Sequence, residues 1–410
     1  MIIVEDLERR FHTLSSERKR LLELYLGLDA QYAFSKERSV PYKHGLYAGS
    51  ELRIKLQKEV NSYLYRAYPV CIITAYANLI PWYASRNIQL CAQTYSDGYI
   101  VPDYMESEFY YLEVLDHAKF TYEQLNEMTD NIVNYIIDQI NKGYYVNIFL
   151  DEYYLENKSR YLKEHFVHEN LIYGYDNSTR KFKTVGLDKN DMFNLFTHEY
   201  DELRLGFEEG KKHYMVDAPY AAGGALHIIK VKDTEKEHIF EQDIFLNRIN
   251  SFLCSEGDLE RVNLPYRPGF DNEKPSASNM VYGLEVILQI VKRLRMLANG
   301  EVCLDYRAIH LVSEHGKGLY NKLKFIAECP NVPGGIADPV NRYIGTAELF
   351  ERLRIKALEL LYNRDIGSIE FKENLDEIIG MLENGIESEK QLLGEVYKIL
   401  REGKERRQPA

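Results

Sequence analysis

The segment 168–188, HENLIYGYDNSTRKFKTVGLD, most constrains how this chain can fold. Apolar and aromatic residues fill two runs of strand length, and residues 177–180 between them are typical of a turn. Two strands joined by a short turn pair antiparallel, so residues at their open ends face each other. His168 begins the first strand and Asp188 ends the second. The pattern therefore predicts a β-hairpin that brings an imidazole and a carboxylate together.

An imidazole beside a carboxylate is the orienting half of a nucleophilic triad, because the carboxylate fixes the tautomer and stabilises the imidazolium. Cys71 is the candidate nucleophile. Residues 68–82, YPVCIITAYANLIPW, are apolar or small almost throughout, which predicts a buried helix from Pro69 to Pro81. Cys71 would then lie at the helix N-terminus, where free N–H groups and the dipole favour a thiolate.

Other assignments remain open. Asp191 can replace Asp188, because the register at a strand end is uncertain by a few residues. Cys91 is a rival nucleophile, in a stretch, QLCAQTYSDG, that is typical of a strand end or loop. A single cysteine in an apolar helix is also common as a small core residue.

A metal site was considered around His165 and His168, which can share a helix face with Asp151 or Glu169 nearby in the chain. The stretch HFVHE matches no zinc motif. The pair Gly223–Gly224 belongs to no nucleotide-binding motif either. We therefore expect no metal and no other resident cofactor.

The composition limits the classes of protein. Hydrophobic residues make up 45% and charged residues 28% of 410, which is typical of a globular protein with about two domains. With 63 acidic and 51 basic residues, the net charge of -12 argues against a nucleic-acid binder. The five cysteines form no disulfide framework. The charged start MIIVEDLERRFH and the lack of a long apolar run predict no export, no membrane helix and a cytoplasmic location.

Periodicity predicts a mixed first half and a helical second half. Thr121 and Gln124 form a capping-box pattern before an amphipathic helix that Gly143 would end. A strand over 144–151 follows, and 192–210 contains a further helix. Glu314 and His315 are interpreted as a buried polar cluster near Asp305 and Arg307. The remaining elements are a strand over 223–231, a loop over 255–278, and helices over 240–254, 279–298, 305–327, 346–363, 369–384 and 387–402.

These elements divide into an N-terminal helical segment (1–60), a catalytic core (61–235) and a mainly helical region (236–410). Residues 14–27, LSSERKRLLELYLG, predict an amphipathic helix. This segment is similar to those that adjoin carrier domains in nonribosomal peptide synthetases.

The hairpin HENLIYGYD…KFKTVGLD resembles the histidine-strand-turn-strand-aspartate segment of papain-like proteins of the peptidase C39 type. The strand over 143–155 and the region 281–326, with LDYRAIHLVSEHGKG, are similar to the family of the butirosin biosynthesis H protein. An amide-forming enzyme of closthioamide assembly has a related design.

This resemblance implies an α+β fold with a papain-like cysteine-protease core, an antiparallel sheet plus a central helix, and an appended C-terminal α-helical region. It implies an acyltransferase of natural-product or nonribosomal peptide biosynthesis, with Cys71 as nucleophile, His168 as base and Asp188 as orienter. The acyl donor would be an acyl or peptidyl carrier protein, whose phosphopantetheine brings the thioester. The acceptor would be a small-molecule amine, and a homodimer is left open.

Two alternatives share these observations. One is a cysteine peptidase or amidase that uses the same triad for hydrolysis. The other is a non-catalytic scaffold that binds a carrier protein, with Cys71 as a core residue. The sequence does not identify the side chain that would stabilise the oxyanion. Papain-like enzymes usually place a glutamine a few residues before the cysteine for this purpose, and SYLYRAYPV before Cys71 contains none.

Overall fold

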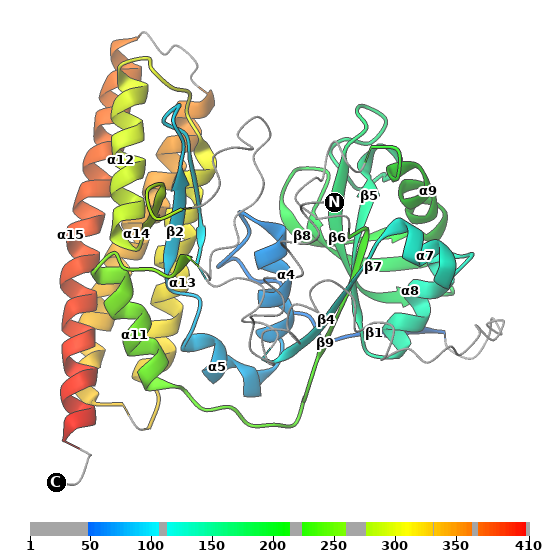
Figure 1. The fold of residues 1–410 in the computed structure, drawn as a ribbon, viewed down its shortest axis with the longest axis horizontal. Coiled ribbons are helices and arrows are strands. Elements are labelled where there is room, and N and C mark those ends of the chain that lie inside the picture. Colours follow the sequence, from blue (N-terminus) through cyan, green and yellow to red (C-terminus); the bar gives the residue numbers. More distant parts are fainter. Residues whose placement is uncertain are drawn as a thin grey trace, which may run out of the picture. The chain divides into compact units, whose positions relative to one another are not determined.

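The computed structural model describes residues 48–105, 113–213, 224–259, 276–330, 332–362 and 368–406. They form a mixed α+β fold with antiparallel sheets and C-terminal helices (Figure 1). The chain divides into two compact units. The first holds the described residues up to Leu56 and within Tyr111–Thr234, and the second those within Gln57–Tyr110 and Glu235–Ala410.

The first unit contains a seven-stranded antiparallel sheet. Its strand order is β4-β9-β5-β6-β7-β8, and β1 pairs with β6 outside this path. The central strands β5 and β6 are buried along nearly their whole length, and most of their residues are apolar or aromatic. The strands are β1 (Gly49–Glu51), β4 (Leu115–Phe120), β5 (Tyr145–Asp151), β6 (Val167–Asp176), β7 (Lys181–Leu187), β8 (Phe193–Glu199) and β9 (Leu226–Val231).

The predicted hairpin is confirmed as β6 and β7. Leu171 pairs with Val185, and the register shifts at a bulge between Ile172 and Gly174. Arg180 ends the turn with a positive φ of 54°. The strand predicted over 144–151 is confirmed as β5.

Three helices pack against this sheet. They are α7 (Tyr122–Met128), α8 (Ile132–Asn141) and α9 (Tyr200–Gly210), and their apolar faces share one core with the strands. The capping box of Thr121 and Gln124 is confirmed, and Gly143 has the left-handed φ of 86° expected after a helix. The single helix predicted over 121–143 is two helices, because the Asn131 side chain caps a new start.

Residues 192–210 contain the expected helix, α9, but their first half is strand β8. The sequence FNLFTHE gives a weak periodic signal, and its extended form is fixed by pairing with β7 along the whole strand.

The second unit combines a small sheet with helices. Its strands are β2 (Leu90–Thr94), β3 (Ile100–Tyr104) and β10 (Met280–Tyr282), in the order β10-β2-β3. Residues 57–110 therefore group with the C-terminal region rather than with the hairpin, because β2 pairs with a strand that lies far along the chain. Three consecutive domains were expected from the sequence.

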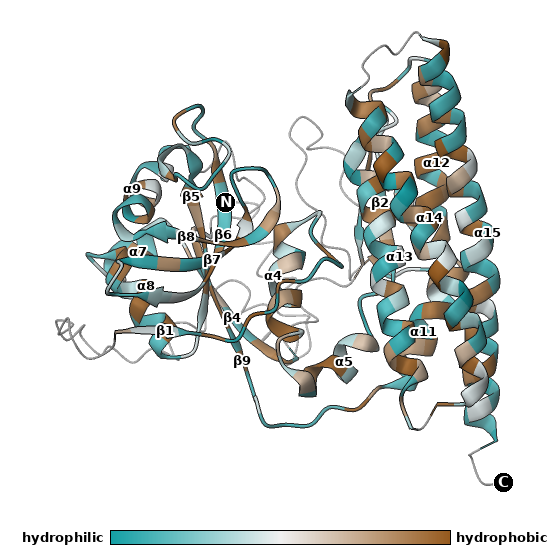
Figure 2. Ribbon diagram, turned by 180° about the vertical axis from the view of Figure 1, so that it is seen from behind, coloured by the Kyte–Doolittle hydropathy of each residue, from teal (hydrophilic) through white to brown (hydrophobic). Residues whose placement is uncertain are grey.

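Long helices form most of the second unit. They are α11 (Gln242–Leu253), α12 (Leu284–Ala298), α13 (Tyr306–Ala327), α14 (Ala337–Tyr362) and α15 (Ile369–Glu405), and α12 to α15 run side by side in Figure 1. Figure 2 shows hydrophobic and hydrophilic bands along them, as amphipathic packing requires. The two helices predicted over 369–384 and 387–402 are one helix, α15, with Ser368 as its N-cap.

The helix predicted over 68–82 was wrong in its bounds. Helix α4 runs over Leu64–Ile73, followed by the short helices η1 (Ala77–Leu79) and α5 (Ile80–Ala84). Pro69 lies inside α4, and Pro81 lies in the first turn of α5. Cys71 is thus in the last turn of its helix rather than the first. The helix dipole at that end opposes a thiolate.

Two expectations fall wholly or partly outside the described residues. The predicted helix over 14–27 lies outside them, as does the part of the 255–278 loop between residues 260 and 275. Within the described ranges, no helix is both long and apolar enough to cross a membrane.

Candidate functional site

His168 lies near the start of β6, opposite Leu150 of β5. Its side chain is 20% exposed, and its ring Nδ1 is 3.3 Å from Oε1 of Glu152. Glu152 directly follows β5 and begins the short helix η2 (Glu152–Tyr154). A carboxylate in this position holds the proton on Nδ1 and leaves Nε2 as the basic nitrogen.

A buried lysine keeps Glu152 charged. The Nζ atom of Lys158 is 3.0 Å from Glu152 Oε1 and donates a hydrogen bond of 2.7 Å to the carbonyl oxygen of Leu187. Burial acts to raise the pKa of Glu152, but Lys158 and His168 outweigh it and hold that pKa at about 2. The imidazole therefore faces a permanent carboxylate at neutral pH.

Asp188 occupies the predicted hairpin end but is engaged in a turn. Its carboxylate accepts the backbone N–H groups of Asn190 and Met192 and the side-chain amide of Asn194. Burial acts to raise the pKa of Asp188, and these hydrogen bonds lower it overall. The alternative residue, Asp191, accepts a 2.6 Å hydrogen bond from the Ser159 hydroxyl.

The carboxylate within bonding distance of His168 is therefore that of Glu152. Sequence reasoning missed this residue, because β5 and β6 are joined by a long connection whose path the pattern does not fix. The available signal was the pair Asp151–Glu152 at the end of a buried strand.

A second histidine lies near the same ion pair. His198 of β8 is fully buried, and neither of its ring nitrogens has a hydrogen-bond partner within the described part of the chain. Burial lowers the pKa of His198 to about 3, and the charge of Lys158 adds to the shift. His198 is therefore a neutral core residue.

In the second unit, the Cys71 side chain is 0% exposed. Burial raises the pKa of the thiol to about 11, and hydrogen bonds with the backbone and side chain of Gln57 offset this only in part. The resting side chain is therefore a thiol and not a thiolate.

Gln57 is a neighbour of Cys71 that the sequence did not reveal. Its carboxamide accepts the N–H groups of Glu59 and Val60 and donates to the Val60 carbonyl oxygen at 2.6 Å. This tight turn folds the chain back, so a residue 14 positions before the cysteine reaches its sulfur. Gln57 lies outside the few residues directly before Cys71, where papain-like enzymes usually have a glutamine.

Two polar anchors fix the segment around α4. The guanidinium of Arg66 is 3.0 Å from the carboxylate of Asp103 on β3, and the Tyr65 hydroxyl donates to the same carboxylate at 2.7 Å. Arg66 and Asp103 are both buried. A buried ion pair with two hydrogen bonds holds α4 against β3, because breaking it would leave an unpaired buried charge.

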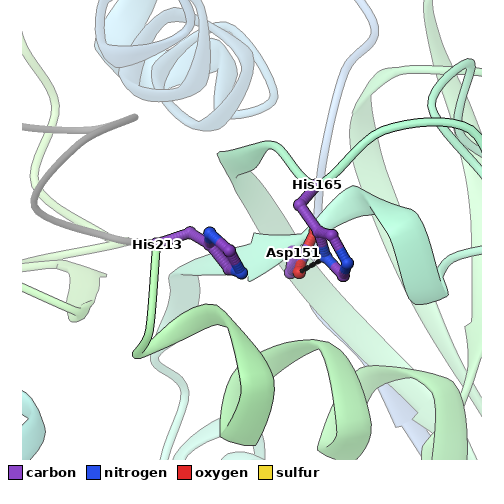
Figure 3. Close-up of side chains that lie close together, drawn as sticks. All are labelled: Asp151, His165 and His213. Carbon is purple, nitrogen blue, oxygen red and sulfur yellow. Dashed lines mark hydrogen bonds and ion pairs between the residues drawn. The ribbon is translucent and has the colours of Figure 1, made fainter.

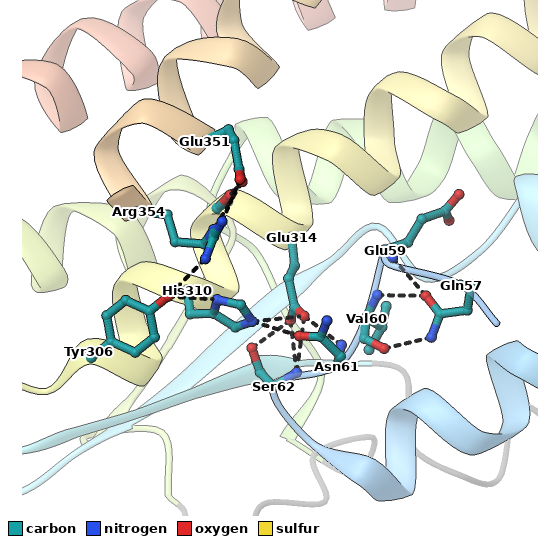
Figure 4. A network of polar contacts seen from close by, with 11 residues as sticks. Gln57, Glu59, Val60, Asn61, Ser62, Tyr306, His310, Glu314, Glu351 and Arg354 are labelled. Atoms are coloured by element: carbon teal, nitrogen blue, oxygen red, sulfur yellow. Dashed lines mark hydrogen bonds and ion pairs between the residues drawn. The ribbon is translucent and has the colours of Figure 1, made fainter. Parts of the chain in front are cut away.

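The second anchor is Glu314 of α13. Its carboxylate accepts the N–H groups of Asn61 and Ser62 and the Ser62 hydroxyl (Figure 4). His310 Nε2 lies 3.2 Å from Glu314 and 2.6 Å from the Asn61 side chain. The network therefore ties α13 to the turn that presents Gln57.

Glu314 and His315 are both buried as predicted, but they do not form one cluster with Asp305 and Arg307, because His315 contacts Glu389 and Arg307 bonds Asp305 and the Tyr99 hydroxyl.

Cys91, the rival nucleophile, is the second residue of β2 and pairs with Asp103 of β3. It is fully buried and forms no disulfide. Cys71 also has no disulfide, and it belongs to the second unit, whereas His168, Glu152 and Asp188 belong to the first.

The structure brings together some of the residues that the sequence offered as alternative metal ligands. His165 lies with Asp151 and with His213, as Figure 3 shows. His168 is bonded to Glu152, and the Glu169 carboxylate accepts a 3.0 Å hydrogen bond from Asn147.

No known protein family matches this chain, and no curated protein is significantly similar to it. The resemblance to papain-like acyltransferases therefore stays a prediction.

Proposed function

We propose that this protein is a papain-like, cysteine-dependent acyltransferase that moves an acyl group from a carrier-protein thioester to a small-molecule amine. The observation that supports this best is the pair of His168 and Glu152. A partly exposed imidazole with a buried, charged carboxylate on Nδ1 is the arrangement that nucleophilic enzymes use for their base, which supports the proposal. In this proposal Glu152 has the orienting role that was predicted for Asp188.

The high pKa of Cys71 sets the order of events. The proposal requires His168 of the first unit to act as the base for Cys71 of the second. Nε2 would take the thiol proton as the sulfur attacks the thioester carbonyl, so the thiolate forms only during attack. The carrier thiol leaves with that proton. The amine then attacks the acyl-enzyme, His168 accepts the amine proton, and the thiol of Cys71 is restored.

Gln57 is the proposed oxyanion donor. Its carboxamide is held beside Cys71 by the turn that Glu314 anchors. The carboxamide nitrogen donates to the carbonyl oxygens of Val60 at 2.6 Å and Ala67 at 3.5 Å, and the longer bond would be exchanged for one to the oxyanion of the tetrahedral intermediate. Amide formation from a thioester is downhill and needs no ATP, so the remaining task is to exclude water.

Intact-protein mass spectrometry tests the proposal. After mixing with an acyl-loaded carrier protein, the chain should gain one acyl mass on Cys71, and an added amine should discharge it as an amide. Cys71→Ala should gain no mass, and His168→Ala should gain it at least 100-fold more slowly. Free acid as the main product in the presence of amine would indicate the peptidase or amidase alternative.

A specific observation favours a second candidate, the non-catalytic carrier-binding scaffold. Cys71 is fully buried with a raised pKa, as in a core residue. If the wild-type protein binds an acyl carrier protein without gaining mass, and Cys71→Ala binds equally well, the scaffold function replaces the enzyme.

A further inference from the structure

Beside the pair of Glu152 and His168 lies a second carboxylate–histidine pair, Asp151 and His165. Asp151 ends β5, and its side chain is 0% exposed. One oxygen, Oδ1, accepts the N–H groups of Tyr153 and Phe166, both at 3.1 Å. The other oxygen, Oδ2, is 2.7 Å from Nδ1 of His165. The carboxylate is thus fixed by the backbone and presents one free edge to the imidazole.

A third side chain completes the group. His213 lies in the turn that ends α9, and its ring stacks on His165 with centroids 4.8 Å apart and planes inclined by 11°. One ligand atom from each of Asp151, His165 and His213 lies within 4.8 Å of the others. Figure 3 shows the three side chains converging from three segments.

Two glycines of α9 make this convergence possible. A Cβ atom at Gly206 would lie 3.2 Å from the Asp151 carbonyl oxygen, and one at Gly210 would lie 3.2 Å from the Asp151 nitrogen. Their i,i+4 spacing places both on one helix face. The end of α9 therefore approaches the Asp151 backbone closely, and this contact carries His213 to the carboxylate.

We propose that Asp151, His165 and His213 bind a divalent transition-metal ion of the Zn²⁺ class. Metal–ligand bonds of ~2.0–2.1 Å require ligand atoms about 3.3 Å apart in a tetrahedral site. The pair Asp151–His165 must open by roughly half an ångström to reach this spacing, and the His213 ring must move inward. His165 is 42% exposed and His213 is half-buried. The His165 ring stacks on Tyr153, with centroids 4.3 Å apart, as well as on His213, so metal binding requires these rings to shift within the stack.

The ligand set defines the kind of ion and site. Two imidazoles with one carboxylate suit Zn²⁺, Co²⁺ or Fe²⁺ and are poor ligands for Ca²⁺ or Mg²⁺. Three protein ligands leave a coordination position for water, as in open rather than structural zinc sites. The site does not depend on the proposed acyl transfer, because Glu152 and His168 are separate residues with separate bonds.

Cobalt titration of the full-length protein, treated with chelator and then desalted, tests the site. We expect one equivalent of Co²⁺ to produce visible d–d absorption bands and to be displaced by Zn²⁺. His213→Ala should weaken the affinity at least tenfold, and His165→Ala and Asp151→Asn should remove saturable binding. His213→Ala changes only a half-buried turn residue, so circular dichroism should show an unchanged fold.

His168→Gln is the matched control, because it alters a histidine three residues from His165 that lies outside the group. It should retain the wild-type Co²⁺ affinity. Exposed Cys254 and Cys303 can also bind Co²⁺, and they would add thiolate charge-transfer bands in the near ultraviolet. Binding that shows these bands, that survives His213→Ala and His165→Ala, or that fails to saturate at one equivalent would overturn the proposal.

Discussion

Nδ1 of His168 lies 3.3 Å from Oε1 of Glu152. Asp151, which directly precedes Glu152, makes a similar contact: its Oδ2 lies 2.7 Å from Nδ1 of His165. Two adjacent carboxylates at the end of β5 thus serve two histidines spaced three residues apart. They differ in their surroundings, since Lys158 forms an ion pair with the Glu152 carboxylate, whereas backbone N–H groups donate to the Asp151 carboxylate. The two pairs can therefore be separated by mutation.

The assignment of the orienting carboxylate gives the first prediction. Glu152→Gln should lower the rate of acyl transfer by about 10²–10⁴, because the imidazole loses the charge that fixes its tautomer. Asp188→Asn should change the rate less than about threefold, since Asp188 is bonded to the turn that follows β7. Single-turnover loss of acyl thioester, measured for both variants, checks this.

Glu152→Gln also leaves Lys158 without its carboxylate, so its melting temperature must be compared with the wild type. Glu152→Asp, which retains the charge, should recover part of the rate. Equal losses in Glu152→Gln and Asp188→Asn would contradict the assignment to Glu152.

The second prediction concerns the resting thiol of Cys71. A pKa of about 11 leaves on the order of 10⁻⁴ of the thiol ionised at pH 7, and burial also excludes reagents. Iodoacetamide should therefore label exposed Cys254 and Cys303 well before Cys71 in the free protein. Peptide mapping by mass spectrometry measures the order. Labelling of Cys71 ahead of Cys254 would show an activated thiolate and contradict the proposed order of proton transfer.

The elements that the sequence predicted well are those with strong local signals. The hairpin 168–188 and the cap at Thr121 depend on turn and capping residues within a few positions. Strand β8 was missed because its extended form comes from pairing with β7. The pattern misplaces the start of α4, because a proline is typical of a first helical turn, whereas the helix begins five residues before Pro69 and contains the proline in its interior.

The site was less predictable, because its contacts join distant segments. His168 was found from the hairpin, but Glu152 reaches it from the other neighbouring strand. Gln57 and His213 were missed because a tight turn and a glycine-mediated helix contact bring them into place. Such approaches depend on tertiary packing, which residue spacing alone does not encode.

The third prediction tests the anchor between α13 and the turn before α4. Glu314→Ala should lower the free energy of unfolding by about 1–3 kcal/mol, because the partly buried N–H groups of Asn61 and Ser62 lose their acceptor. Glu314→Gln keeps an acceptor oxygen and should cost less. Glu348→Ala, at an exposed position of α14, is the control and should cost under about 0.5 kcal/mol in urea denaturation. Equal effects of Glu314→Ala and Glu348→Ala would contradict the anchor.

The helical unit contains two buried titratable side chains whose pKa values are shifted in opposite directions. Glu389 of α15 accepts a hydrogen bond from the Tyr343 hydroxyl, and its Oε1 is 3.5 Å from Nε2 of His315. Burial raises the pKa of Glu389 to about 8. Burial, with the charge of Lys322, lowers the pKa of His315 to about 3. Both side chains are therefore neutral in the folded protein near pH 6.

These shifts predict a pH dependence of stability. Folded Glu389 holds its proton up to about pH 8 and the unfolded chain releases it near pH 4.5, so its stabilising effect is lost as the pH rises. His315 has the opposite effect between about pH 3 and 6.5. In this range only the unfolded chain binds a proton at His315, so the stability rises with pH. The two slopes cancel between about pH 4.5 and 6.5, which leaves a net decline above pH 6.5.

Glu389→Gln should remove this decline. The wild type should lose about 2 kcal/mol of unfolding free energy between pH 6.5 and 8 relative to the variant, from about 1.4 kcal/mol per pH unit. Urea denaturation, followed by circular dichroism at about 222 nm, which is dominated by the helices, measures the unfolding free energy. It should be repeated for both proteins at pH intervals of about half a unit. Glu387→Gln removes an exposed carboxylate two residues away and should keep the wild-type profile. If Glu389→Gln and the wild type decline in parallel above pH 6.5, the carboxyl of Glu389 is already ionised in the folded protein.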